Sequence, residues 1–156
     1  MARRHPPLRY LPYREARRLP HIVVDGAPQA STVLTLSHWP NNATPDRYRR
    51  DTSTETTLAW LEDHDPRRVA GVVTNSHFDE DGLFSMFTLL DPDRAWRHRA
   101  LLADAARAGD FGVYRARAAA RLCFIIEGHA DPQRPPLPRP VFAGTATERI
   151  AALYRA

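Results

Sequence analysis

Short apolar segments alternate with polar loops along the first half of the chain. Three of these segments have the length and the β-branched content of strands, and turn-forming residues follow them. They are residues 21–24, 32–36 and 69–74. The third is almost continuously apolar, which is typical of a strand covered on both faces. We therefore expect residues 69–74 to form an interior strand.

Helices are predicted between and after these strands. Thr52 and Glu55 have the spacing of a capping box, which predicts a helix from there to about Glu62. Residues 83–90 read as a buried helix, and residues 91–93 end it and begin another to about residue 108. A turn at 109–112, a helix over 113–127 and a proline-rich loop at 132–140 follow. A second capping box at 145–148 begins a last helix, which stops at residue 156 without a capping residue.

This alternation of strands and helices predicts an α/β fold, with a parallel or mixed sheet and helices on its faces. We expect one domain over residues 21–156, because 156 residues suit a single hydrophobic core. The uncapped end suggests that this domain is shortened at its C-terminus. Residues 1–20 are rich in arginine and proline without periodicity, so a basic irregular arm is predicted there.

Composition narrows the functional classes. The net charge is +4, and all 22 basic residues are arginine, whose planar fork suits phosphate. The sequence has no glycine-rich phosphate loop, no zinc-finger spacing and no Gly-x-Ser-x-Gly motif. The single cysteine, Cys123, lies in an apolar run and is expected in the core. No signal sequence or membrane-length apolar stretch is found, so we expect a cytoplasmic protein without membrane contact.

The loop after the third predicted strand carries the strongest chemical signal. His77, Asp79 and Asp81 alternate, and Gly82 follows them. In an extended loop, alternate side chains point to the same side, so the three could share one metal ion. Imidazole with carboxylates suits Mn²⁺, Zn²⁺ or Fe²⁺, whereas carboxylates alone favour Mg²⁺ or Ca²⁺. The alternative is a solvated turn whose aspartates cap the following helix.

The segment from Val72 to Ser85 resembles the first motif of the DHH phosphoesterases: an apolar strand, an Asp-x-Asp-Gly loop and a buried helix. The resemblance implies a doubly wound DHH-like sheet. It also implies that His77, Asp79 and Asp81 ligate divalent metal, with Mn²⁺ favoured and Mg²⁺ as the alternative. The family's Asp-His-His triplet is absent. Residues 36–90 also resemble an uncharacterised bacterial family, through their Ser-His-Trp-Pro and His-Phe-Asp-Glu-Asp-Gly segments.

Two further residues are candidates for the same site. His38 follows the second predicted strand, as a fourth ligand or a catalytic acid, and Asp110 in the predicted turn could add a carboxylate. The combined hypothesis is a metal-dependent phosphoester hydrolase that acts on a phosphorylated small molecule or a short nucleic acid. The alternative is a non-catalytic relative, which binds a metal, a nucleotide or a protein and has lost part of the active site.

Overall fold

The computed structural model of this chain describes residues 7–134 and 136–156. Its centre is a four-stranded parallel sheet with the strand order β1-β4-β2-β3. The strands are β1 (Arg9–Tyr10), β2 (His21–Val24), β3 (Thr32–Leu36) and β4 (Val72–Thr74). The helices are α1 (Tyr13–Ala16), α2 (Ser53–Leu61), α3 (Glu80–Leu90), α4 (Pro92–Phe111), α5 (Arg117–Ala130) and α6 (Ala146–Leu153). Short 3₁₀ turns cover Asp46–Tyr48, Pro66–Arg68 and Arg139–Phe142.

The prediction that residues 69–74 form an interior strand is confirmed for its second half. β4 lies between β1 and β2, with Ile22 opposite Val73 and Val23 opposite Thr74. All three residues of β4 are buried. The strand begins later than expected, because the N–H of Val69 bonds to Pro66 in a 3₁₀ turn and so cannot join the sheet.

The prediction of an irregular arm over residues 1–20 is wrong for residues 7–20, and residues 1–6 lie outside the described part of the chain. β1 adds to the edge of β4, where the N–H of Arg9 bonds to Gly71 and that of Leu11 to Val73. Leu8 is buried as well. These two residues of strand were too few to give a periodic signal, and only the exposed edge of β4 makes them a strand.

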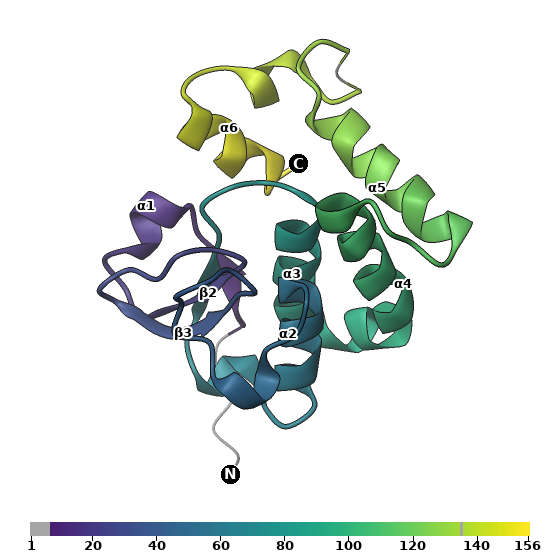
Figure 1. Cartoon of the computed structure of the whole chain (residues 1–156). Coiled ribbons are helices and arrows are strands. Elements are labelled where there is room, and N and C mark those ends of the chain that lie inside the picture. The colour runs from purple at the N-terminus through teal and green to yellow at the C-terminus, as the bar shows by residue number, and fades with distance from the viewer. Residues whose placement is uncertain (1–6, 135) are drawn as a thin grey trace.

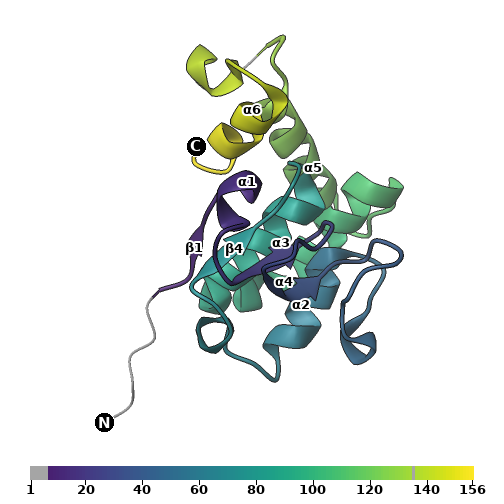
Figure 2. The same ribbon diagram turned by 90° about the vertical axis from the view of Figure 1, so that its left-hand side faces the viewer.

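Helices lie on both sides of the sheet. α2 and α3 pack against it on one side, α4 packs behind them, and α5 packs on α4. α1 lies on the opposite side from α3 (Figures 1 and 2). The main core fills the space between the sheet and the pair α2 and α3; its largest members include Ile22, Leu36, Trp60, Met86 and Leu89. A second apolar cluster joins α3, α4 and α5.

Two helix boundaries differ from the prediction, and both differences matter for the site. α3 begins at Glu80 rather than at residue 83, and Asp79 is its N-cap. In the acidic segment, residues 77–82, the last three residues therefore form the first turn of a helix, whereas His77 and Asp79 precede it. α4 continues through Asp110 to Phe111, so the predicted turn at 109–112 is helical until Gly112, whose left-handed φ of 65° ends the helix.

The chain returns to the acidic segment at its C-terminal end. The capping box that begins α6 is confirmed, with Thr145 and Glu148 bonded reciprocally. After α6, the hydroxyl of Tyr154 accepts a hydrogen bond from the Asn75 side chain at 3.0 Å, and its ring packs on Phe78. No helix in the described ranges is long and apolar enough to cross a membrane.

Candidate metal centre

Four of the residues that form the centre come from loops at one edge of the sheet. Because β2, β3 and β4 are parallel, their carboxyl ends meet at this edge. Asp25 follows β2, His38 follows β3, and His77 and Asp79 follow β4. Asp25 has a φ of 45°, a backbone conformation that aspartate tolerates better than most residues. This turn directs the chain away immediately after the buried strand.

The carboxylate of Asp81 connects α3 to α2. It accepts hydrogen bonds from the N–H groups of Ser53 and Thr54, both at 2.7 Å. These are amides of the first turn of α2, which have no partner within their own helix and carry the positive end of its dipole. Asp81 is fully buried. The contact therefore satisfies a buried charge and fixes the N-terminus of α2 against α3.

His38 lies beside Asp81 on the more open side. Its Nδ1 is 3.0 Å from Asp81 Oδ2 and 3.8 Å from Asp25 Oδ1. The hydroxyl of Ser53 donates to Asp25 Oδ1 at 2.8 Å and accepts from the backbone N–H of His38 at 2.9 Å. Ser53 is thus the group that fixes the imidazole and the carboxylate relative to each other.

His77 lies between two other carboxylate oxygens. Its Nε2 is 2.9 Å from Asp25 Oδ2 and 2.9 Å from Asp79 Oδ2. The second oxygen of Asp79 accepts the N–H of Gly82 and so caps α3. Trp39 covers the imidazole, with the ring centroids 5.1 Å apart.

Asp25 belongs to both groups. Asp25, His38 and Asp81 form one triad whose ligand-type atoms lie within 4.8 Å of one another, and Asp25, His77 and Asp79 form another. Asp25 is 1% exposed, and its Oδ2 makes no hydrogen bond of acceptable geometry within the described residues, although it lies 2.9 Å from His77 Nε2. In the metal-free protein the protonated imidazole balances the buried charge of this carboxylate, and a cation ligated by the neutral imidazole would take over that role. The residues present therefore fit divalent metal, with Asp25 as the shared ligand.

The charges of the metal-free centre are strongly interdependent. Burial opposes protonation of His77, but the adjacent Asp25 and Asp79 carboxylates outweigh it and raise the pKa of His77 to about 10. Burial opposes ionisation of Asp79, and the contact with His77 more than compensates, so the pKa of Asp79 is lowered. Burial and the negative charges of Asp81 and Asp79 raise the pKa of Asp25. The hydrogen bond to Asp81 raises the pKa of His38.

Asp110 lies at the border of the centre. Its Oδ2 is 3.7 Å from His38 Nδ1, but the residue is not a member of either triad. Burial, followed by the charge of Asp81, raises the pKa of Asp110 to about 7. The extension of α4 to Phe111 places it there, so the residue predicted in a turn reaches the site from a helix.

Sequence reasoning found most of this centre and missed two residues. The prediction that His38 approaches the acidic segment is confirmed by its contact with Asp81. Asp25 is absent from the residues predicted for the site, although it follows an apolar strand as His38 and His77 do. The same argument about carboxyl ends of strands would have identified it. Ser53 carries no comparable signal, because a serine at the start of a helix is ordinary.

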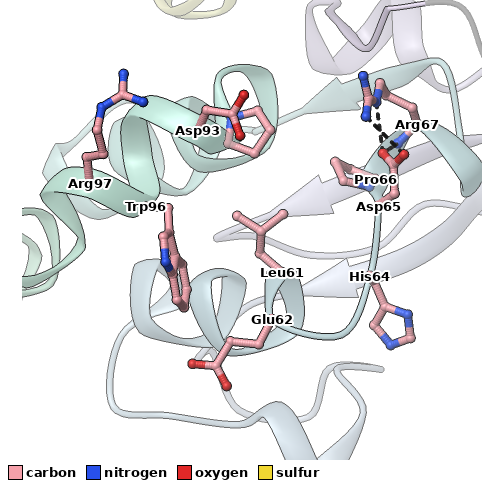
Figure 3. A pocket seen from close by; sticks show the side chains of 10 residues that line it. Leu61, Glu62, His64, Asp65, Pro66, Arg67, Asp93, Trp96 and Arg97 are labelled. Atoms are coloured by element: carbon pink, nitrogen blue, oxygen red, sulfur yellow. Dashed lines mark hydrogen bonds and ion pairs between the residues drawn. The ribbon is translucent and has the colours of Figure 1, made fainter.

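A pocket of about 560 Å³ lies elsewhere, where the C-terminal end of α2 faces the start of α4 (Figure 3). Leu61 and Trp96 give it an apolar wall, and Arg67 at its rim is already paired with Asp65 at 2.9 Å. The pocket residues include none of the ligand-type groups that converge in the described part of the chain. Volume therefore does not identify the chemical site here, whereas the clustered carboxylates and imidazoles do.

The fold and the centre define a class: a parallel α/β protein with two histidine–carboxylate triads at the carboxyl edge of its sheet. The chain belongs to a family described as "Family of unknown function (DUF6687)", whose model matches residues 6–156. No curated protein matches the chain. No solved structure matches it either.

Proposed function

We propose that this protein is a metal-dependent phosphoester hydrolase whose centre holds two divalent cations, with Mn²⁺ favoured and Mg²⁺ as the alternative. The observation that carries the proposal is the position of Asp25, a buried carboxylate shared by two triads. The likeness of the segment from Val72 to Ser85 to the first DHH motif supports the same chemistry. We also propose that the sheet is doubly wound in the DHH-like manner.

Asp25, His77 and Asp79 would hold one cation, and Asp25, His38 and Asp81 the other. Paired cations lower the pKa of bound water and stabilise the charge that develops on a phosphoryl group. Asp81 and Ser53 contribute by fixing the ligand set, because their hydrogen bonds tie α2 to the centre. His38 has a second role in this proposal: it can move a proton at its unshared nitrogen when it does not ligate. The substrate class is a phosphorylated small molecule or a short nucleic acid.

The experiment is hydrolysis of bis-p-nitrophenyl phosphate by protein stripped with EDTA and then supplied with Mn²⁺ or Mg²⁺. Activity should require the added metal. Asp25→Asn and His77→Ala should each lower Mn²⁺ affinity at least about tenfold and remove most of the turnover, since outer-shell changes alone have effects of that size. Asp93→Asn, at an exposed aspartate on the first turn of α4, is the matched control and should retain both.

A second candidate function is a non-catalytic relative that binds a metal, a nucleotide or a protein. Asp81 favours it, because both of its oxygens already accept hydrogen bonds from backbone amides. Mn²⁺ binding that depends on Asp25, with no hydrolysis of phosphodiesters or phosphomonoesters, would identify this alternative. Equal Mn²⁺ binding by wild type, Asp25→Asn and His77→Ala would overturn the metal centre and both metal-based candidates with it.

A further inference from the structure

A fully buried asparagine precedes His77 and Asp79 in the loop that follows β4. Asn75 is 0% exposed. Its side-chain oxygen accepts the backbone N–H of His77 at 3.2 Å. Its side-chain nitrogen donates to the Tyr154 hydroxyl at 3.0 Å, across 79 positions of sequence. One amide group therefore joins a candidate metal ligand to the segment that follows α6.

The direction of these two hydrogen bonds follows from their chemistry. A backbone N–H can only donate, so the oxygen of the Asn75 amide must face His77. The nitrogen of the same amide must then face Tyr154, whose hydroxyl is the acceptor. Tyr154→Phe would therefore leave a buried N–H of Asn75 without this acceptor, and the asparagine would no longer be fixed from both ends.

A glycine leaves the space in which this contact forms. A Cβ at Gly82 would overlap the Asn75 side-chain nitrogen and lie 2.8 Å from the Tyr154 hydroxyl. The same Cβ would be 3.1 Å from Asp79 Oδ1, the oxygen that caps α3. The tyrosine hydroxyl thus reaches the asparagine directly beside the second ligand of the cation that His77 would hold.

A second tyrosine in the same aromatic cluster lacks this connection. The ring centroids of Tyr10 and Tyr154 are 5.0 Å apart. The Tyr10 hydroxyl is buried, but it has no hydrogen-bond partner within the described residues. Removing either hydroxyl changes the same cluster by one oxygen atom, and only the hydroxyl of Tyr154 bonds to Asn75.

We propose that Tyr154 is a positioning residue for the metal centre, and that it acts on His77 through the side chain of Asn75. The inference rests on the cation site that the proposed function assigns to Asp25, His77 and Asp79. Tyr154 fixes the asparagine, and the asparagine fixes the peptide N–H of His77. The imidazole is thereby kept with its Nε2 facing the two carboxylates. Losing a group that orients a metal ligand weakens metal binding by about 10–100-fold.

The other cation site is fixed independently of Tyr154. The carboxylate of Asp81 is held by the first amides of α2, and the backbone N–H of His38 is held by the Ser53 hydroxyl. None of the hydrogen bonds among the described residues joins these groups to the asparagine or the tyrosine. Contact between the segment after α6 and the loop after β4 should therefore set the affinity of one cation site and not of both.

The test compares Tyr154→Phe with its matched control Tyr10→Phe, by calorimetric titration of the full EDTA-stripped chain with Mn²⁺. Wild type should show two binding events, and His38→Ala should weaken the event that belongs to the other site. Tyr154→Phe should weaken the remaining event at least about tenfold, whereas Tyr10→Phe should leave both events unchanged. Equal weakening of both events by Tyr154→Phe, or of neither, would overturn the proposal.

A double-mutant cycle tests whether the tyrosine acts through the asparagine. Asn75→Ala should weaken the same binding event as Tyr154→Phe, and adding Tyr154→Phe to Asn75→Ala should cause no further loss. A general loss of stability would instead give losses that add. Additive losses of Mn²⁺ affinity would therefore overturn the proposed path through Asn75.

A third measurement needs no metal and only the conservative variants, so it holds even if Asn75→Ala fails to fold. NMR in EDTA gives the exchange rates of the backbone amides of His77 and of Ala95, which bonds to Asp91 in α4. Tyr154→Phe should accelerate the His77 amide by a larger factor than the Ala95 amide, since the lost contact is local. Equal acceleration of both amides, or of neither, would overturn the positioning role. Wild type that binds Mn²⁺ without hydrolysing phosphoesters would overturn the hydrolase function and leave this role intact, because none of the three measurements needs turnover.

Discussion

The carboxylate of Asp81 accepts the backbone N–H of Ser53 at 2.7 Å, across 28 positions of sequence. This contact joins the first turns of α3 and α2, and the two helices cover the same side of the sheet. It therefore gives Asp81 a structural role that is independent of any metal. Asp79 belongs to the same motif but, among the described residues, has no such contact with α2, since its hydrogen bond goes to Gly82 in its own helix.

The first prediction follows from this difference. Asp81→Ala would leave the amides of Ser53 and Thr54 buried without an acceptor, so we expect the free energy of unfolding to fall by about 3 kcal/mol. Asp79→Asn keeps an oxygen for the Gly82 N–H and should cost less than about 1 kcal/mol. Urea unfolding in EDTA measures both. Equal losses in the two variants would contradict the structural role of Asp81.

The second prediction concerns the packing of Tyr154 on the acidic segment. A Cβ at Gly82 would overlap the Asn75 side-chain nitrogen and lie 2.8 Å from the Tyr154 hydroxyl. Gly82→Ala should therefore destabilise the protein by about 2 kcal/mol and release the C-terminal end. Gly128→Ala in α5, where a Cβ meets nothing within 4 Å, should stabilise it by about 0.5–1 kcal/mol. Thermal unfolding together with limited proteolysis near Tyr154 tests this pair.

The third prediction is a proton released on metal binding. In the metal-free protein the pKa of His77 is about 10, so the imidazole is protonated at pH 7, whereas a ligand must be neutral. Binding of Mn²⁺ to Asp25, His77 and Asp79 at pH 7 should therefore release about one proton from His77. Affinity should rise roughly tenfold per pH unit until the pH approaches 10. Calorimetry in two buffers of different ionisation enthalpy measures the release, and His77→Ala should lack it.

The same shift affects stability without metal. The pKa of His77 is raised on folding from an ordinary value of 6.5, so its ion pairs stabilise the fold fully below pH 6.5. That contribution should be lost as the pH rises through about 10. If His77→Ala and wild type in EDTA show the same decline in melting temperature between pH 7 and pH 10, the ion pairs do not form.

The fourth prediction concerns Asp110, whose pKa is raised from 3.8 to about 7 by burial and by the negative charge of Asp81. Ionisation therefore costs more in the folded state, and stability without metal should decrease as the pH rises from about 4 to 7. Asp110→Asn removes this cost and should be more stable than wild type at pH 8, on the order of 2 kcal/mol. At pH 4 the two should be equal. Chemical unfolding of both proteins at pH 4 and pH 8 measures this difference in the free energy of unfolding.

The parts of the site that depend on local order along the chain could be predicted from the sequence. Apolar runs identified β2, β3 and β4, and the alternation with helices indicated a sheet whose carboxyl ends share an edge. If the strands are parallel, that argument brings His38 toward the acidic segment, and the parallel pairing and the contact of His38 with Asp81 confirm it. The capping residues Thr52 and Thr145 could also be predicted, since each one bonds to the backbone N–H only three residues further along the chain.

Three-dimensional packing determines which side chains converge and which of them already have hydrogen-bond partners. Alternation suggested that His77, Asp79 and Asp81 share one side, but α3 begins at Glu80, and helical rotation separates Asp81 from the other two. Asp25 became the shared ligand because strand order places β2 beside β4, and sequence distance carries no information about that neighbour. β1 is a strand for the same reason. Hydrogen bonding to an edge depends on which edge is available, and that is a property of the whole sheet.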